Sequence, residues 1–149
     1  MNNINHIFLL LFALASLDCS SQPANDSATI VKLLKEDYAT MGSLDIKAHL
    51  TNLTNDYLLL EHGRIWDAKT EVDSIYRKYA DSIFTRTDFF TIKTLKISGN
   101  MAYGVWHLRS EFRQNGTITE LTWNESGVFR KEKGGWKIAL IHSSRERQD

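Results

Sequence analysis

The hydrophobic positions change their period along the chain, from helical spacing in the first half to alternation in the second. In the first half they recur every three or four residues, which predicts three amphipathic helices. The three apolar faces consist of Ile30, Leu34, Tyr38 and Met41, then Ile46, Leu50 and Leu53, then Val72, Ile75, Tyr76 and Tyr79. The candidate N-caps are Asp26 or Ser27, then Ser43 or Asp45, then Asp67, and Gly42 ends the first helix.

The second half has no helical period, and its apolar residues alternate with polar ones as they do in strands. The predicted strands are 57–61 with a brief partner at 65–66, then 83–88, 91–97, 101–114, 117–131 and 136–143. Turn-forming residues separate the last four strands, and Gly134-Gly135 predicts a two-residue hairpin turn. Strands this long rarely stay flat. The order of elements therefore predicts an α+β fold with two to three helices on one face of a strongly curved antiparallel sheet.

Alternation also predicts which side chains face the helices. One side of the strand 101–112 carries no charge, and its residues are Ala102, Gly104, Trp106, Leu108, Ser110 and Phe112. On the next strand Trp123 and Glu125 share a side, and on the last strand His142 continues the series of Trp136, Ile138 and Leu140. We expect these three sets to face the interior.

The first 25 residues form a separate region. Ile7–Leu17 is an apolar run of eleven residues, too short to span a bilayer as a helix but typical of an export signal. Cys19 follows it and resembles the lipid-attachment cysteine of bacterial lipoproteins, although Asp18 stands where a small residue is expected. We predict an export signal at 1–18, a polar linker at 19–27, one domain at 28–144 and a tail at 145–149. Cleavage after Ala15 without acylation is the alternative to a lipid-anchored protein.

Composition excludes several classes of function. The 149 residues contain 18 basic and 18 acidic side chains, so the chain lacks the positive field that nucleic-acid binding requires. Cys19 is the single cysteine, and His49, His62 and His107 show no metal-type spacing, so we predict no metal and no cofactor. No glycine-rich phosphate loop or serine nucleophile motif is present in the sequence, which disfavours common nucleotide enzymes and hydrolases.

Two segments carry a family resemblance. Asn55-Asp-Tyr-Leu-Leu-Leu-Glu-His-Gly63, after two helices, and the closing 125–144 with its Gly-Trp-Lys-Ile and His-Ser are similar to the nuclear transport factor 2-like superfamily. That superfamily includes SnoaL-like polyketide cyclases, ketosteroid isomerases and a kinase association domain. The resemblance implies a cone-shaped α+β barrel with a pocket between helices and sheet, usually in a homodimer. One fold of this kind hosts both catalysts and binding domains, so the residues must decide the activity.

The same resemblance assigns candidate catalytic residues. Glu61 falls where ketosteroid isomerases have their proton-transferring carboxylate, and Tyr38 falls where they have a proton-donating tyrosine. A carboxylate in a dry pocket can shuttle protons, and a phenol can stabilise an oxyanion. The third acid of the isomerases is absent, because Ser126 or Gly127 occupies its place. The alternative is a solvent-facing Glu61 beside Arg64 and a core Tyr38.

The remaining candidate pocket residues are Tyr57, Trp106, Phe112, Trp123, Glu125 and His142. The aromatic ones are pocket walls for a flat apolar ligand or plain core. Glu125 among aromatics needs a partner, for which Arg109, Arg113 and His142 are candidates. His142 is a general base or a histidine with one structural hydrogen bond.

Two functions follow from these residues. The first is an exported binding protein for a small hydrophobic ligand, or one whose sheet face only forms a dimer. The second is a cofactor-free isomerase, cyclase or dehydratase with Glu61 as base and Tyr38 as oxyanion donor. A partner-protein adaptor is a third possibility, and it requires a large exposed apolar patch.

Overall fold

The computed structural model describes residues 22–77 and 85–146. The predicted export signal, Cys19, Tyr79 and the start of the predicted strand at 83 lie outside the described residues. The elements follow the predicted order: α1 (Gln22–Ser43), α2 (Ile46–Asn52), β1 (Leu53–Glu61), β2 (Arg64–Asp67), α3 (Ala68–Glu71), η1 (Val72–Tyr76), β3 (Thr85–Ser98), β4 (Met101–Gln114), β5 (Thr117–Glu132) and β6 (Gly135–Arg145). The η1 segment is one turn of π-helix that continues α3.

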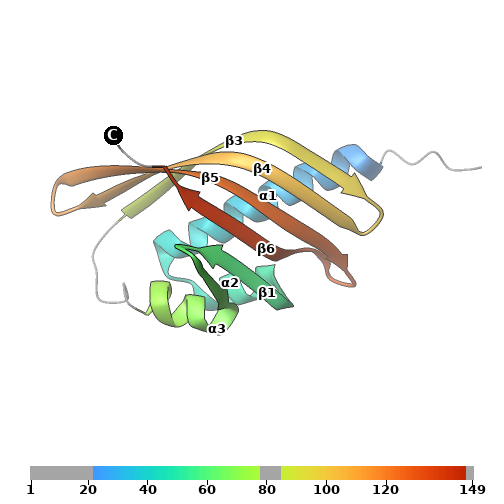
Figure 1. Cartoon of the computed structure of the whole chain (residues 1–149), viewed down its shortest axis with the longest axis horizontal. Helices are drawn as coiled ribbons and strands as arrows, with labels where there is room; N and C mark the ends of the chain where they lie inside the picture. The colour runs from blue at the N-terminus through green and yellow to red at the C-terminus, as the bar shows by residue number, and fades with distance from the viewer. Residues whose placement is uncertain (1–21, 78–84, 147–149) are drawn as a thin grey trace, which may run out of the picture.

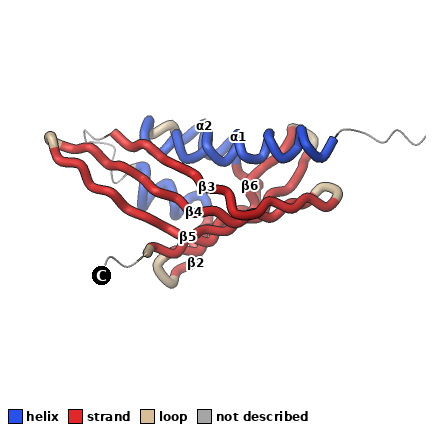
Figure 2. Tube along the Cα trace, turned by 90° about the horizontal axis from the view of Figure 1, so that it is seen from above, coloured by secondary structure: helices blue, strands red, loops and turns tan. Residues whose placement is uncertain are grey.

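The strands form one six-stranded sheet in the order β2-β1-β6-β5-β4-β3. Neighbouring strands are antiparallel except β1 and β6, which pair in parallel. The sheet is strongly curved and does not close, and α1 and α2 lie along its concave side (Figures 1 and 2). The fold is therefore the predicted α+β cone. Within the described residues, no helix combines the length and hydropathy that crossing a membrane requires.

Two helix starts confirm the predicted caps. The Asp45 side chain accepts a hydrogen bond from the backbone N–H of Ala48, and Asp67 accepts one from Thr70. Each carboxylate satisfies an N–H group that has no partner within the first helical turn.

The predicted start of the first helix was wrong. Helix α1 begins at Gln22, so residues 22–27 are helical rather than a linker. Asp26 does not cap this helix; its carboxylate accepts hydrogen bonds from Lys131 Nζ at 3.0 Å, which ties the first turns of α1 to β5.

The second helix is shorter than predicted, because Leu53 already belongs to β1. Its buried side is also different: Leu50 is 46% exposed, whereas His49 is fully buried. The predicted strands 83–88 and 91–97 are one strand, β3, with a register shift between Ile92 and Thr94.

The alternation predicted for β4 is confirmed. Ala102, Trp106, Leu108 and Ser110 are buried, and the residues between them are more exposed. Trp106 packs in the core with Leu34, Tyr38, Phe129 and Ile138 among others. This core packs α1 against the inner face of the sheet.

The last hairpin differs from the prediction in its turn. Glu132 pairs with Gly135, so the two turn residues are Lys133 and Gly134. Gly135 alone of the two glycines has a positive φ, at 115°, and it begins β6.

A β-bulge in β6 reverses the facing of that strand. Phe129 pairs with Ile138 but the preceding Val128 pairs with Leu140, so Ala139 is an extra residue. Trp136 and Ile138 are buried before the bulge, and Ile141 and Ser143 are buried after it. The prediction that His142 faces the interior was therefore wrong, because the bulge turns it to the exposed outer face.

Candidate functional site

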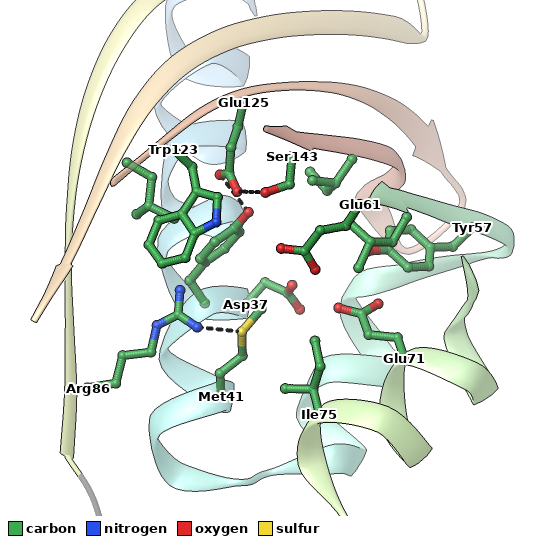
Figure 3. Close-up of a pocket in the computed structure, with 14 residues that line it drawn as sticks. Asp37, Met41, Tyr57, Glu61, Glu71, Ile75, Arg86, Trp123, Glu125 and Ser143 are labelled. Carbon is green, nitrogen blue, oxygen red and sulfur yellow. Dashed lines mark hydrogen bonds between the residues drawn. The ribbon is translucent and has the colours of Figure 1, made fainter. Parts of the chain in front are cut away.

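A cavity of about 70 Å³ lies between the helices and the inner face of the sheet, and we call it the inner chamber (Figure 3). Helix α1, strand β1, the α3–η1 segment and the sheet all contribute to its wall. Its polar lining consists of Asp37, Tyr38, Tyr57, Glu61, Glu71, Arg86, Glu125 and Ser143. Tyr38 and Glu61, the two predicted catalytic residues, therefore line the same cavity.

A wider cleft of about 720 Å³, the outer cleft, lies beside the inner chamber. The two spaces share Met41, Glu61, Ile75, Arg86 and Trp123, so they adjoin each other. The aromatic and aliphatic wall of the outer cleft includes Trp66, Phe112, Leu121 and Trp123. Such a wall accommodates an apolar body.

Glu125 lies at one end of the inner chamber and is completely hydrogen-bonded. Tyr38 Oη and Trp106 Nε1 each donate to its Oε2 at 2.7 Å, and Ser143 Oγ donates to its Oε1 at 2.8 Å. Its exposed fraction is 4%. Burial raises the pKa of Glu125, and the three hydrogen bonds oppose that rise.

The position of Trp106 depends on Gly127, which is why the indole can reach Glu125. A Cβ atom on Gly127 would lie 2.8 Å from Trp106 Cη2 and 3.0 Å from the Leu140 carbonyl oxygen. Any other residue would therefore displace the ring or the neighbouring strand. Gly104 on β4 pairs with Gly127, and because it has no side chain it leaves further room on the same side of the sheet.

The predicted partners of Glu125 were wrong. Arg109 and Arg113 stand on the opposite side of β4, where Arg109 contacts Glu111 at 2.8 Å and Glu120 at 2.7 Å. His142 is not a partner of Glu125 either, because the bulge in β6 places it on the outer face of the sheet. The partners come instead from α1, β4 and β6, and the aromatic Trp106 is one of them rather than a wall of the chamber.

Tyr38 projects from α1 into the chamber and is 5% exposed. Its ring packs edge-on against Phe90, with ring centroids 5.2 Å apart. Burial, followed by the charge and hydrogen bond of Glu125, raises the pKa of the Tyr38 phenol well above its usual range. Its hydroxyl proton is directed at Glu125, not at open space in the chamber.

Glu61 ends β1 with its carboxylate directed into the chamber (Figure 3). Its side chain is 17% exposed, and the nearest ring nitrogen, Nε2 of the exposed His62, is 3.7 Å away. Burial is the main reason why the pKa of Glu61 is raised. This placement differs from the alternative of a solvent-facing carboxylate beside Arg64.

Sequence reasoning missed a buried network around His49. Its Nδ1 is 3.0 Å from Asp37 Oδ1, and its Nε2 is 3.5 Å from Glu71 Oε2. Burial disfavours the protonated ring, but the interactions with Asp37 and Glu71 outweigh it and raise the pKa of His49 to about 9. Asn52 Nδ2 also donates to Asp37 Oδ1 at 3.1 Å. His49 is therefore an internal cation beside the chamber.

A sequence signal for Asp37 and Glu71 was present. Asp37 is three residues after Leu34 and Glu71 is four before Ile75, so each occupies a position on an apolar helical face. Both are buried, at 3% and 1% exposed. Tyr57, a predicted pocket residue, lines the chamber beside them, and burial followed by the charge of Glu71 raises its pKa.

Arg86 on β3 stands between the inner chamber and the outer cleft. Its Nε donates to Asp88 Oδ1 at 2.8 Å, its Nη1 to Met41 Sδ at 2.9 Å and its Nη2 to Ser110 Oγ at 3.3 Å. The guanidinium carbon is 5.2 Å from the centroid of the Phe112 ring. These contacts hold a cation on the side of the site opposite Glu61 and Glu71 (Figure 3). Within 22–77 and 85–146, no group of three or more His, Cys, Asp or Glu has the arrangement of a metal site.

The curved open sheet, the helices in its concavity and the chamber between them define an NTF2-like fold, as the resemblance implied. Residues 30–146 match the model of the SnoaL-like domain, and the chain therefore belongs to this family of the NTF2-like superfamily. No curated protein matches the chain significantly.

Solved structures agree on the fold. A conserved protein from Planctomyces limnophilus has a TM-score of 0.72 and 19% identity over 83% of this chain and 99% of its own. A candidate dehydratase of the NTF2-like family from Streptomyces avermitilis has a TM-score of 0.73 and 15% identity over 85% and 99%. A ketosteroid isomerase-like protein from Erwinia carotovora atroseptica has a TM-score of 0.64 and 21% identity over 81% and 96%. At these identities the likeness establishes the fold alone.

Proposed function

We propose that this protein binds a small molecule with an apolar body, which occupies the outer cleft and extends one end into the inner chamber. The observation that carries the proposal is the adjacency of the two spaces: the chamber of about 70 Å³, with its buried carboxyls, shares five wall residues with a cleft of about 720 Å³ whose wall includes Trp66, Phe112 and Trp123. Concave sites with apolar walls and a few convergent polar groups are typical of ligand pockets.

Binding of the neutral fluorophore N-phenyl-1-naphthylamine tests this proposal. Leu121→Trp places an indole in the outer cleft, and we expect it to weaken the affinity at least tenfold. Ile118→Trp is the matched control, because Ile118 is on the same strand but 54% exposed and not part of the cleft. No fluorescence change with the wild-type protein, or equal affinity in both variants, would contradict the proposal.

A second candidate function is cofactor-free isomerase, cyclase or dehydratase chemistry with Glu61 as general base. Glu61 supports it because its carboxylate faces the chamber and its pKa is raised by burial, as proton transfer near neutral pH requires. Glu61 would remove a proton from a carbon next to a carbonyl group and return it to another carbon. To stabilise the oxyanion, Tyr38 would turn its O–H from Glu125 to the substrate oxygen, since the proton is now directed at Glu125.

The catalytic candidate is tested with the β,γ-unsaturated ketone 3-cyclohexen-1-one, whose isomerisation to the conjugated ketone is followed by absorbance. We expect Glu61→Gln to lower the rate at least 100-fold without changing fluorophore affinity. Glu36→Gln, on the exposed side of α1, is the control. If the wild-type protein isomerises the ketone no faster than buffer alone, the catalytic candidate gains no support from this substrate. An active Glu61→Gln variant would exclude Glu61 as the base.

Export and lipid attachment remain part of the proposal. The apolar run Ile7–Leu17 followed by Cys19 supports an exported protein, periplasmic or anchored through an acylated Cys19. Mass spectrometry of the protein from its own host would detect the acyl chains. Cys19→Ser would then move the protein from the membrane fraction to the soluble fraction.

The outer face of the sheet supports a homodimer. Leu58, Leu140, Val128 and Tyr103 form one cross-strand row over β1, β6, β5 and β4, with Tyr103 54% exposed. Val105 and Met101 on β4 extend the apolar surface. Sedimentation equilibrium should give a dimer for the wild-type protein and a monomer for Tyr103→Glu.

A further inference from the structure

Charge is unevenly distributed around the inner chamber. Among the described residues, five carboxyl groups lie in or beside it, those of Asp37, Glu61, Glu71, Asp88 and Glu125, whereas the cationic side chains there are Arg86 and His49. Arg86 is paired with Asp88 at 2.8 Å, and His49 is shared between Asp37 and Glu71. The chamber therefore carries more potential negative charge than its own cations balance.

The excess is concentrated at one end. Figure 3 shows the carboxylates of Asp37, Glu61 and Glu71 pointing toward the same part of the chamber, and we call these three groups the acidic end. Glu61 and Glu71 also interact electrostatically, because the charge of Glu71 contributes to the raised pKa of Glu61. Arg86 lies on the other side of the chamber, beside Trp123.

Glu71 is the member of the acidic end with an unsatisfied oxygen. It is 1% exposed, it lines the chamber, and its Oε2 accepts no hydrogen bond from the residues that the structure describes. His49 Nε2 is 3.5 Å from that oxygen, so the contact is an ion pair without hydrogen-bond geometry. A buried carboxylate with an unsatisfied oxygen is costly, and a ligand N–H in the chamber would add a donor to the Glu71 carboxyl group.

We propose that the acidic end binds the ammonium group of a primary amine whose apolar body lies in the outer cleft, an inference that rests on the proposed function. An ammonium group has three N–H donors and no acceptor, which matches three carboxyls converging on one space. A chamber of about 70 Å³ holds such a head group, while a ring system fits the cleft of about 720 Å³. Trp123 lines both spaces and offers the apolar body of the ligand an aromatic wall.

The same charges discriminate against other ligands. A carboxylate in place of the ammonium group would meet Glu61 and Glu71 at close range, and like charges in a buried site repel strongly. A hydroxyl group would donate a single hydrogen bond and carry no charge. The order of affinity for one apolar body should therefore be amine, alcohol, acid.

Isothermal titration of the folded protein with tryptamine, tryptophol and indole-3-propionate tests this order, because the three compounds share the indole body. We expect tryptamine to bind at least tenfold more tightly than tryptophol, and indole-3-propionate to bind most weakly. Equal affinities, or a preference for the acid, would overturn the proposal. If none of the three binds while N-phenyl-1-naphthylamine does, the amine inference fails and the proposed binding function stands; if the fluorophore also fails, both fall.

Two variants locate the amine. Glu61→Gln and Glu71→Gln should each lower the preference for tryptamine over tryptophol at least fivefold and leave tryptophol affinity within twofold. Glu36→Gln, on the exposed side of α1, should change neither affinity. If Glu71→Gln does not fold, Glu61→Gln alone makes the comparison. An unchanged preference in a folded variant of the acidic end would overturn the assignment.

Discussion

Two groups of buried carboxyls share the inner chamber and differ in how completely the protein satisfies them. Glu125 accepts hydrogen bonds from Tyr38, Trp106 and Ser143, one from each of three elements. At the acidic end, Glu71 Oε2 accepts none within the described part of the chain, and its nearest cationic group is 3.5 Å away. Burial alone therefore does not distinguish a structural carboxyl from one available to a ligand, but the supply of donors does.

The difference follows from where the donors come from. Around Glu125 they are a tyrosine, an indole and a serine, which carry no charge of their own. Around the acidic end, the internal cation in the described part of the chain is His49, which is shared between two carboxyls. We therefore expect Glu125 to contribute to stability and the acidic end to contribute to binding.

The largest expected effect is at the satisfied carboxyl. Glu125→Ala would leave the Tyr38 hydroxyl, the Trp106 N–H and the Ser143 hydroxyl without their acceptor in a buried space. We expect the free energy of unfolding to fall by about 3–5 kcal/mol, as it does when a buried polar network loses its central member. Urea denaturation at neutral pH measures this loss.

Glu36→Ala is the control for that measurement, because Glu36 pairs with Lys32 on an exposed helical face, where substitutions change stability by about 0.5 kcal/mol or less. A loss below about 1 kcal/mol for Glu125→Ala would show that water replaces the carboxylate. The contrast between the two groups would then disappear.

The second prediction concerns the cation that the acidic end shares. The pKa of His49 is about 9 in the folded protein, against the ordinary value of 6.5 that applies to the unfolded chain, so folding favours the protonated ring. Its contribution to stability is complete below pH 6.5 and is lost as the pH rises to 9. The free energy of unfolding should therefore fall by about 3 kcal/mol across that interval.

Denaturant titrations at several pH values measure this dependence. His49→Gln should flatten the curve between pH 6.5 and 9, whereas His107→Gln, a half-buried histidine near Glu146 on the opposite side of the sheet, should not. The ring signals of His49 in the wild-type protein give a second measurement by NMR. A midpoint near 6.5 would mean that Asp37 and Glu71 do not stabilise the charged ring.

The elements of this fold could be predicted where local pattern and tertiary packing agree. The uncharged side of β4 faces the core as predicted, because a strand packed on one face has a period of two. Asp45 and Asp67 cap their helices because a carboxylate at that position satisfies local N–H groups. Both inferences need only residues that are close in sequence.

The site was harder, because it depends on features that no short segment contains. The side of the sheet on which His142 lies could not be predicted, because Ala139 forms a bulge that the alternation of β6 does not reveal. The donors to Glu125 come from residues up to 87 positions away. Asp37 and Glu71 carried a signal, since each interrupts an apolar helical face, but their convergence on His49 is a product of the tertiary fold.

The smallest expected effect is at Glu61, and it has the opposite sign to that at Glu125. Burial raises the pKa of Glu61, so folding favours its protonated form and the ionised form at neutral pH is destabilising. Stability linked to this group is present at low pH and is lost as the pH rises through the folded pKa. Glu61→Gln should therefore increase the free energy of unfolding at pH 8 by about 0.5 kcal/mol.

The pH dependence of this gain separates charge from packing. The difference in the free energy of unfolding between Glu61→Gln and the wild-type protein should vanish below about pH 3, where Glu61 is protonated in both the folded and the unfolded chain. A constant difference at all pH values would mean that the amide packs better than the carboxyl, and a loss of stability at pH 8 would mean that Glu61 is satisfied as Glu125 is. If the free energy of unfolding falls in Glu125→Ala and rises in Glu61→Gln, Glu61 is the carboxyl that is retained at a cost to stability. Such a cost is expected of a group that binds a ligand.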